Sequence, residues 1–137
     1  MDEFSRLLNW IGRHGGGNRL IDASELPTNI DIDGLDLDLH RSDLRQILCK
    51  LRMPSRRSYH LGSVTTGMAG IQSSASHRVV RGREGKRWKI YVSGPDFPDG
   101  EECMDEISSN DLLSEIESLG YQITLRQWIA MGWRPST

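Results

Sequence analysis

Twelve basic side chains fall within residues 41–89 of this 137-residue chain, accompanied by only two acidic residues, Asp43 and Glu84. The segment therefore has a net charge of +10, although the complete chain has a net charge of −2. Such a field attracts phosphate backbones, because each neutralised phosphate releases condensed counterions. Most of the twelve are arginine, whose forked guanidinium suits phosphates and guanine edges. The predicted nucleic-acid contacts are Arg41, Arg45, Lys50, Arg52, Arg56, Arg57, Arg78, Arg81, Arg83, Lys86, Arg87 and Lys89.

Both ends of the chain are acidic. Residues 1–40 hold three basic residues against eight acidic ones, and residues 90–137 hold two against nine. One alternative is that these carboxylates fold over the basic segment and neutralise it inside the molecule. Another is that the acidic ends bind a separate basic protein partner or suppress non-specific binding.

Spacings typical of catalytic or metal sites do not occur in the sequence. The four histidines lack a paired-ligand spacing, and no serine or cysteine sits in a nucleophile signature. Asp31 and Asp33 resemble the start of a calcium loop, but Ser42 occupies the position of its closing glutamate. We therefore predict no catalytic residue, metal or cofactor. A hydrolase assembled from dispersed acids with Lys86 or Lys89 stays an alternative.

Cysteine and apolar residues indicate the compartment. Cys49 and Cys103 form no CxxC pair, and Cys49 lies in an apolar helical pattern, which predicts that it is buried. The apolar runs are far shorter than the ~20 residues of a membrane helix. The acidic start of the chain lacks a secretion signal. We therefore expect a cytoplasmic protein that does not bind membranes.

Helical periodicity dominates the first half of the chain. Residues 3–13 and 42–52 each place apolar side chains on one face, and the second helix carries cations on its other faces. The glycine run 15–17 should end the first helix in a flexible loop; without a following Gly-Lys-Ser/Thr, a P-loop is not favoured. Asp22 and Glu25 have the spacing of a capping box. Residues 30–39 alternate apolar and acidic side chains, which predicts a half-buried strand interrupted by a glycine.

A long segment and a hairpin follow. Residues 53–77 are rich in Ser, Thr and Gly and are predicted to form a loop, either functional or merely mobile. Residues 78–92 read as a β-hairpin around a glycine-containing turn at 82–85. Its second strand should turn one apolar face to the core and leave a cationic face with one aromatic, formed by Arg87, Lys89 and Tyr91.

The C-terminal part should form a helical pair. Residues 94–106 contain turn signals and are predicted to be an acidic loop. Ser108 with Asp111, and Thr124 with Gln127, have capping-box spacing before two apolar-periodic segments. The pair has the dimensions of a helix-turn-helix, but its acidic first helix makes it a poor DNA reader.

Together these elements predict an α+β protein of one small domain, residues 1–137, with a basic segment at 41–92 and an acidic helical segment at 94–137. The order of elements resembles a winged-helix arrangement. That resemblance implies a first helix at 3–13, a recognition helix at 42–52 and a wing at 78–92.

The predicted function is a small nucleic-acid-binding module, a regulatory or accessory protein of a phage, plasmid or bacterium, with DNA favoured over RNA. The alternative is a protein-interaction module or inhibitor, phage- or plasmid-encoded, that acts on a nucleic-acid-processing complex. Salt-dependent binding of oligonucleotides would separate the two.

Overall fold

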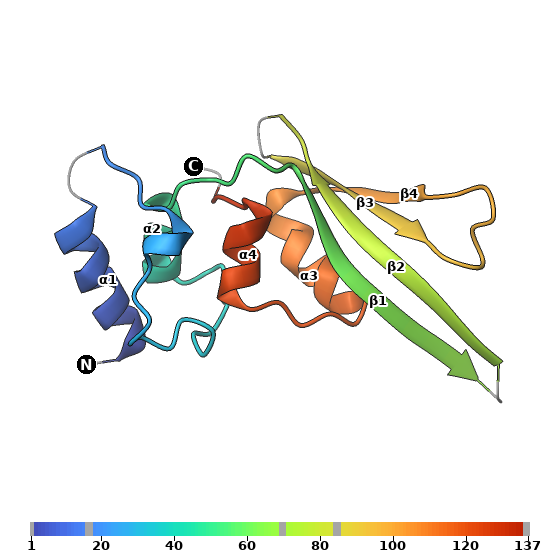
Figure 1. Cartoon of the computed structure of the whole chain (residues 1–137), viewed down its shortest axis with the longest axis horizontal. Coiled ribbons are helices and arrows are strands. Elements are labelled where there is room, and N and C mark those ends of the chain that lie inside the picture. Colours follow the sequence, from blue (N-terminus) through green and yellow to red (C-terminus); the bar gives the residue numbers. More distant parts are fainter. Residues whose placement is uncertain (1, 16–17, 69–70, 84–85, 136–137) are drawn as a thin grey trace. The chain divides into compact units, whose positions relative to one another are not determined.

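A computed structural model describes residues 2–15, 18–68, 71–83 and 86–135. The described residues form four α-helices, two short 3₁₀-helices and one four-stranded antiparallel sheet, which confirms the α+β class (Figure 1). The chain divides into two compact units. We call residues 1–55 with 123–137 the helical unit, and residues 56–122 the sheet unit. Organisation as a single domain stays a prediction.

The helical unit contains three of the α-helices and one 3₁₀-helix. The first helix begins where the Asp2 carboxylate accepts a 2.8 Å hydrogen bond from the amide of Ser5, which caps the helix. The 3₁₀-helix begins with the predicted capping box of Asp22 and Glu25. The elements are α1 (Glu3–His14), η1 (Ala23–Glu25), α2 (Ser42–Cys49) and α4 (Leu125–Met131).

The two helices predicted in the first half are confirmed, and they bury the predicted faces. The second ends at Cys49 rather than at 52, because Leu51 pairs with Ile21 in an isolated parallel bridge. Gly16 and Gly17 of the predicted loop lie outside the described residues. The helices α1 and α2 together bury Phe4, Leu7, Ile11, Leu44, Ile47 and Leu48.

The strand predicted at 30–39 is wrong: these residues form turns, bends and irregular backbone. Ile32 and Leu35 are buried, whereas Leu37 and Leu39 are half-buried, so the alternation reports burial only in the first part of the segment. However, the Asp31 carboxylate accepts a 3.0 Å bond from the amide of Gly34, and that of Asp38 accepts one from His40. Such local bonds give the backbone an alternative to a strand ladder.

The helical pair predicted at the C-terminus is confirmed as two helices. The capping box before α4 is present, because Thr124 and Gln127 exchange side-chain-to-amide bonds. Gly132 ends α4 with φ of 83°, a left-handed conformation that favours glycine. No helix in the described part of the chain is long and apolar enough to cross a membrane.

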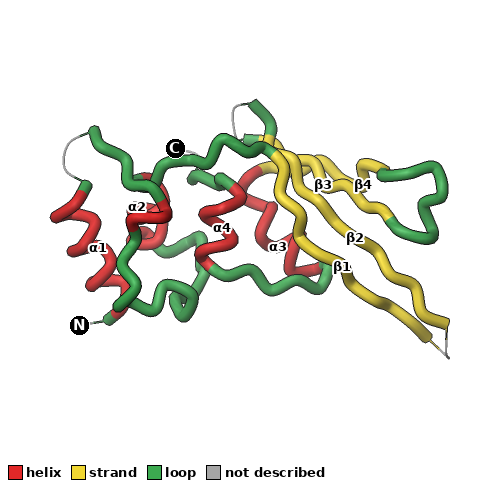
Figure 2. Tube along the Cα trace, viewed as in Figure 1, coloured by secondary structure: helices red, strands yellow, loops and turns green. Residues whose placement is uncertain are grey.

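The sheet unit is a meander of four antiparallel strands in the order β1-β2-β3-β4, drawn in yellow in Figure 2. The hairpin predicted at 78–92 is confirmed by the pairing of β2 with β3, although residues 84 and 85 of its turn lie outside the described residues. The strands are β1 (Ser58–Met68), β2 (Ile71–Arg81), β3 (Arg87–Ser93) and β4 (Glu102–Ser108).

Two predicted loops are wrong in whole or in part. Residues 53–77 were expected to be a loop, but most of them form β1 and the start of β2. The acidic loop at 94–106 ends early, because β4 begins at Glu102. Both segments lack a strong apolar alternation and gain their strand structure from pairing with neighbours. One such cross-strand contact is the 2.7 Å hydrogen bond between the hydroxyls of Ser63 and Ser76.

One face of the sheet is tied to the segment that contains η2 (Ser109–Asp111) and α3 (Leu112–Ser118). Before α3, the hydroxyl of Ser109 accepts a 3.0 Å bond from the buried indole of Trp88. After α3, the hydroxyl of Tyr121 bonds to His77 on β2 and to the carbonyl of Gly62 on β1. Since Trp88 and His77 point to the same side of the sheet, α3 lies on that side.

Candidate nucleic-acid interface

The pairing of β2 with β3 sorts side chains onto two faces of the sheet. We call the face toward α3 the inner face and the opposite one the outer face. The predicted division of β3 is confirmed: Trp88, Ile90 and Val92 are buried, whereas Arg87 and Lys89 are exposed. The outer face therefore holds Arg78 and Val80 from β2 beside Arg87, Lys89 and Tyr91 from β3.

Exposed cations gather where three strand termini meet. The amide of Arg81 donates a 2.8 Å bond to the carbonyl of Arg57, which places the start of β1 beside the end of β2. The amide of Gly82 donates a 2.9 Å bond to the carbonyl of Arg87, which places the start of β3 there too. We call this end of the sheet the basic end; its exposed side chains are Arg56, Arg57, Arg83, Lys86 and Arg87.

Lys89 extends the basic end along the outer face. It is exposed, and β-sheet pairing places it opposite Val80 on one side and Glu106 on the other. Glu106 instead forms its ion pair with Arg87, at 3.9 Å between half-exposed side chains. A pair of that length and exposure contributes little to stability. This weak pair leaves both Arg87 and Lys89 available to a phosphate.

Arg78 lies further along the outer face but is committed to partners within the protein. Its guanidinium donates to both carboxylate oxygens of Glu101, at 2.9 and 2.5 Å, and to the hydroxyl of Ser58 at 2.8 Å. It also lies 4.8 Å from the ring centroid of Tyr91. The bonds from Arg78 lower the pKa of Glu101 below its usual range. The guanidinium of Arg78 is therefore engaged by groups within the protein and is less available to a ligand than the exposed cations.

Arg81 points to the inner face, since it pairs with Trp88 across the strands and is only 9% exposed. Its guanidinium donates a 3.3 Å bond to the carbonyl of Arg56 at the start of β1. Arg81 is thus placed to hold the strands together, not to contact a ligand on the outer face.

Four predicted contacts belong to the helical unit. Arg41 pairs with Asp43 at 2.7 Å and lies 3.8 Å from the ring centroid of Phe4. The hydrogen bond from Arg41 lowers the pKa of Asp43. Arg45 is half-buried on α2, while Lys50 and Arg52 are exposed.

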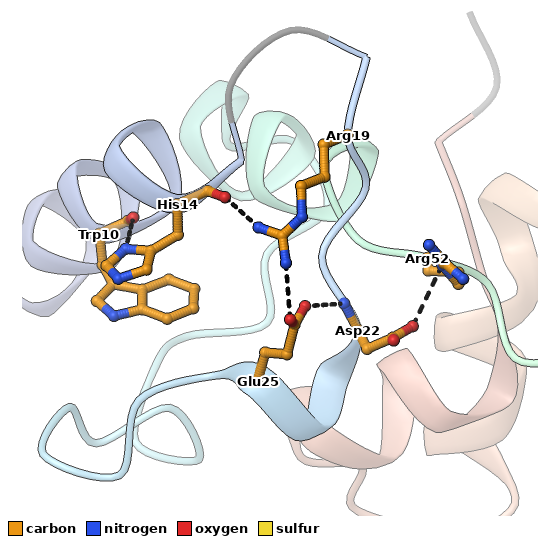
Figure 3. A network of polar contacts seen from close by, with 6 residues as sticks. All are labelled: Trp10, His14, Arg19, Asp22, Glu25 and Arg52. Carbon is orange, nitrogen blue, oxygen red and sulfur yellow. Dashed lines mark hydrogen bonds and ion pairs between the residues drawn. The ribbon is translucent and has the colours of Figure 1, made fainter.

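Arg52 takes part in a polar network around η1 (Figure 3). Its guanidinium is 3.3 Å from the carboxylate of Asp22, whose amide donates to Glu25 at 3.0 Å. Glu25 in turn pairs with Arg19, which donates to the carbonyl of His14 at the end of α1. This network joins α1, η1 and the residues after α2, so Arg52 has a role inside the helical unit.

Neutralisation of the basic segment by the acidic ends, the alternative raised from the sequence, occurs at some residues. Arg52, Arg78 and Arg87 pair with Asp22, Glu101 and Glu106, which belong to those ends. Within the described residues, no ion pair joins a carboxylate to Lys50, Arg56, Arg57, Arg83, Lys86 or Lys89. Most of these free cations lie in the sheet unit.

Sequence reasoning missed the polar cluster on the inner face. Tyr121 donates a 2.9 Å bond to the carbonyl of Gly62, so His77 donates through Nδ1 to the Tyr121 hydroxyl, at 2.8 Å. Burial lowers the pKa of His77 and raises that of Tyr121. Gly62 has φ of 132° beside a bulge in β1, and only glycine adopts that backbone readily. That glycine was the one signal of the cluster in the sequence.

The structure also describes the surroundings of the cysteine and aspartate residues considered from the sequence. Cys49 is exposed, which contradicts the prediction that it is buried, because it lies outside the face of α2 that buries Leu44, Ile47 and Leu48. Asp33 pairs with Arg126 at 3.6 Å. No group of three or more His, Cys, Asp or Glu side chains suited to a metal occurs among the described residues.

Comparison of the chain with protein-family models, curated proteins and solved structures found no match.

Proposed function

We propose that this protein binds nucleic acid through the basic end and the adjoining outer face of its sheet unit. The observation that supports this proposal most strongly is the cluster of exposed cations at one end of the sheet, with Lys89 beside it on β3. The cluster consists of Arg56, Arg57, Arg83 and Lys86. Their exposed charges have no carboxylate partner among the described residues. Cations so placed attract a phosphate backbone, and they set position rather than sequence preference.

The geometry of the outer face adds to this support. A regular strand spaces Arg87 and Lys89 two residues apart on the same side, about 6.5 Å along the strand. Two cations on the same side of one strand can therefore contact the same phosphate backbone. We favour DNA over RNA as the ligand, because the order of elements resembles a winged-helix arrangement, in which a recognition helix reads the major groove of DNA.

The test removes two free cations and leaves the fold intact. Lys86→Ala with Lys89→Ala should lower the affinity for random-sequence duplex and single-stranded oligonucleotides about equally across sequences, by roughly tenfold or more at low salt. The matched control is Arg13→Ala with Arg126→Ala, which removes the same charge from the helical unit. Fluorescence anisotropy measures both. Equal affinities for the two double variants would overturn the proposal.

The winged-helix arrangement is a narrower form of the same proposal. It makes α2 the recognition helix and the β2–β3 hairpin the wing, so Arg45 and Lys50 would contact the same duplex as Lys89. Under that arrangement, Arg45→Ala with Lys50→Ala weakens duplex binding and relaxes preference among sequences. If only the sheet unit binds, this variant keeps the affinity of the wild type.

A further inference from the structure

A groove of about 500 Å³ runs between α1 and α2 in the helical unit. These helices pack against one another, as Figure 1 shows. One wall is the α1 ridge of Leu8 and Gly12, spaced four residues apart, with Ile11 beside them. The other wall is the α2 ridge of Gln46, Cys49 and Lys50.

Gly12 is the unusual member of this groove. Glycine inside a helix is unfavourable relative to alanine, because it loses more backbone freedom on folding. A Cβ added at Gly12 would meet no atom within 4 Å, so packing among the described residues does not require glycine there. A bare stretch of helix backbone in the wall of a groove allows another backbone to approach closely.

The charged residues that line the groove indicate which kind of partner would bind there. Its charged lining residues are Arg45 and Lys50, and no carboxylate among the described residues lines it. The groove between two helices is the shape that receives an amphipathic helix, which lays its apolar face inward and its polar edge along the rim. A rim of cations then favours acidic residues along that edge.

We propose that the α1–α2 groove docks an acidic amphipathic helix of a partner protein, with the partner backbone passing over Gly12. This proposal is independent of nucleic-acid binding by the sheet unit, since its residues all belong to the helical unit. In the proposed complex, the exposed Cys49 is part of the docking surface and Lys50 forms an ion pair with an acidic residue of the partner.

Gly12→Ala tests the proposal without weakening the fold. It should raise the melting temperature by roughly 2–4 °C, because alanine restricts the unfolded chain at a site that has room for it. The same methyl obstructs close approach and should weaken docking by about tenfold. The probe is a fluorescent helical peptide of about 16 residues with leucine on one face and glutamate on the other.

Charge provides a second variant and its control. Lys50→Glu should abolish binding of the acidic peptide, whereas Arg13→Glu, the same change on α1 outside the groove, should leave it unaltered. A peptide with lysine in place of glutamate should not bind the wild type. Binding of both peptides alike, or of neither, would overturn the proposal.

The two exposed cysteines report where the peptide sits. Saturating acidic peptide should slow maleimide modification of Cys49 and leave Cys103 on β4 at its free rate. Unchanged labelling of Cys49 would contradict the placement of the peptide in the groove.

Sedimentation of the protein alone should give a monomer. A dimer that protects Cys49 would identify a second copy as the occupant of the groove and overturn the proposal. Oligonucleotide binding by Gly12→Ala should match that of the wild type, which separates this proposal from the proposed function.

Discussion

Glu106 stands on β4 beside the cations of β3, where it would compete with the phosphate of the proposed ligand. Its carboxylate pairs with Arg87 at 3.9 Å, and strand pairing places it opposite Lys89. Glu106→Gln should therefore raise affinity for oligonucleotides about three- to tenfold at low salt, because it removes the repulsion between this carboxylate and the phosphate. Anisotropy titrations measure the gain.

The matched control is Glu117→Gln, which removes the same charge from an exposed position near the end of α3. A gain confined to Glu106→Gln places the ligand on the outer face. An equal gain in both variants would mean that only net charge matters and would contradict a local site.

His77 makes the sheet unit sensitive to acid. Burial lowers the pKa of His77 in the folded protein, so the unfolded chain binds the proton more readily. Stability is therefore complete above about pH 6.5, the usual histidine value, and is lost as the pH falls below it. Thermal melts between pH 8 and 5 should show the loss in the wild type and a smaller loss in His77→Gln.

The carboxylates act in a different pH range. Arg78 lowers the pKa of Glu101, so the stability from that pair is lost only below the usual glutamate value, about 4.3. An identical pH dependence in the wild type and His77→Gln between pH 8 and 5 would contradict the role given to His77.

Among the elements, α4 depends on its N-terminal cap. The hydroxyl of Thr124 accepts a 3.3 Å bond from the amide of Gln127, and the side-chain oxygen of Gln127 accepts a 2.9 Å bond from the amide of Thr124. Thr124→Ala should lower the free energy of unfolding by about 1 kcal/mol. Urea unfolding measures it; Thr124→Ser, which keeps the hydroxyl, should lose far less.

The helices could be predicted from sequence because their signals are local. The apolar face of α1 repeats with helical spacing, and Asp2 and Thr124 supply the caps that the structure contains. The strands are less accessible to prediction. Ser63 and Ser76 belong to a sheet because each faces the other across the β1–β2 pair, and nothing in either segment alone carries that information.

The candidate site was predictable only in part, for the same reason. The alternation in β3 identified Arg87 and Lys89 as outward-facing. However, Arg81 turns inward, and Arg78 is held by Glu101, since strand register and distant partners decide both outcomes. The sequence also gave no sign that Glu106 would stand beside Lys89.

At the scale of the whole molecule, the basic segment does not correspond to one structural unit. The boundary between the units falls between residues 55 and 56, inside the run of cations at 41–89. Linear charge density therefore locates a basic region of the chain but does not define a surface. The sheet unit holds the larger share of the unpaired cations, and the proposed function rests on them.

The salt dependence of oligonucleotide binding tests this account most directly. The logarithm of the association constant of the wild type should fall linearly with the logarithm of salt concentration, because binding releases counterions. Loss of Lys86 and Lys89 together should make the slope shallower by about two, roughly 0.9 for each lost phosphate contact. Absence of binding at low salt, or an unchanged slope in the double variant, would contradict the account.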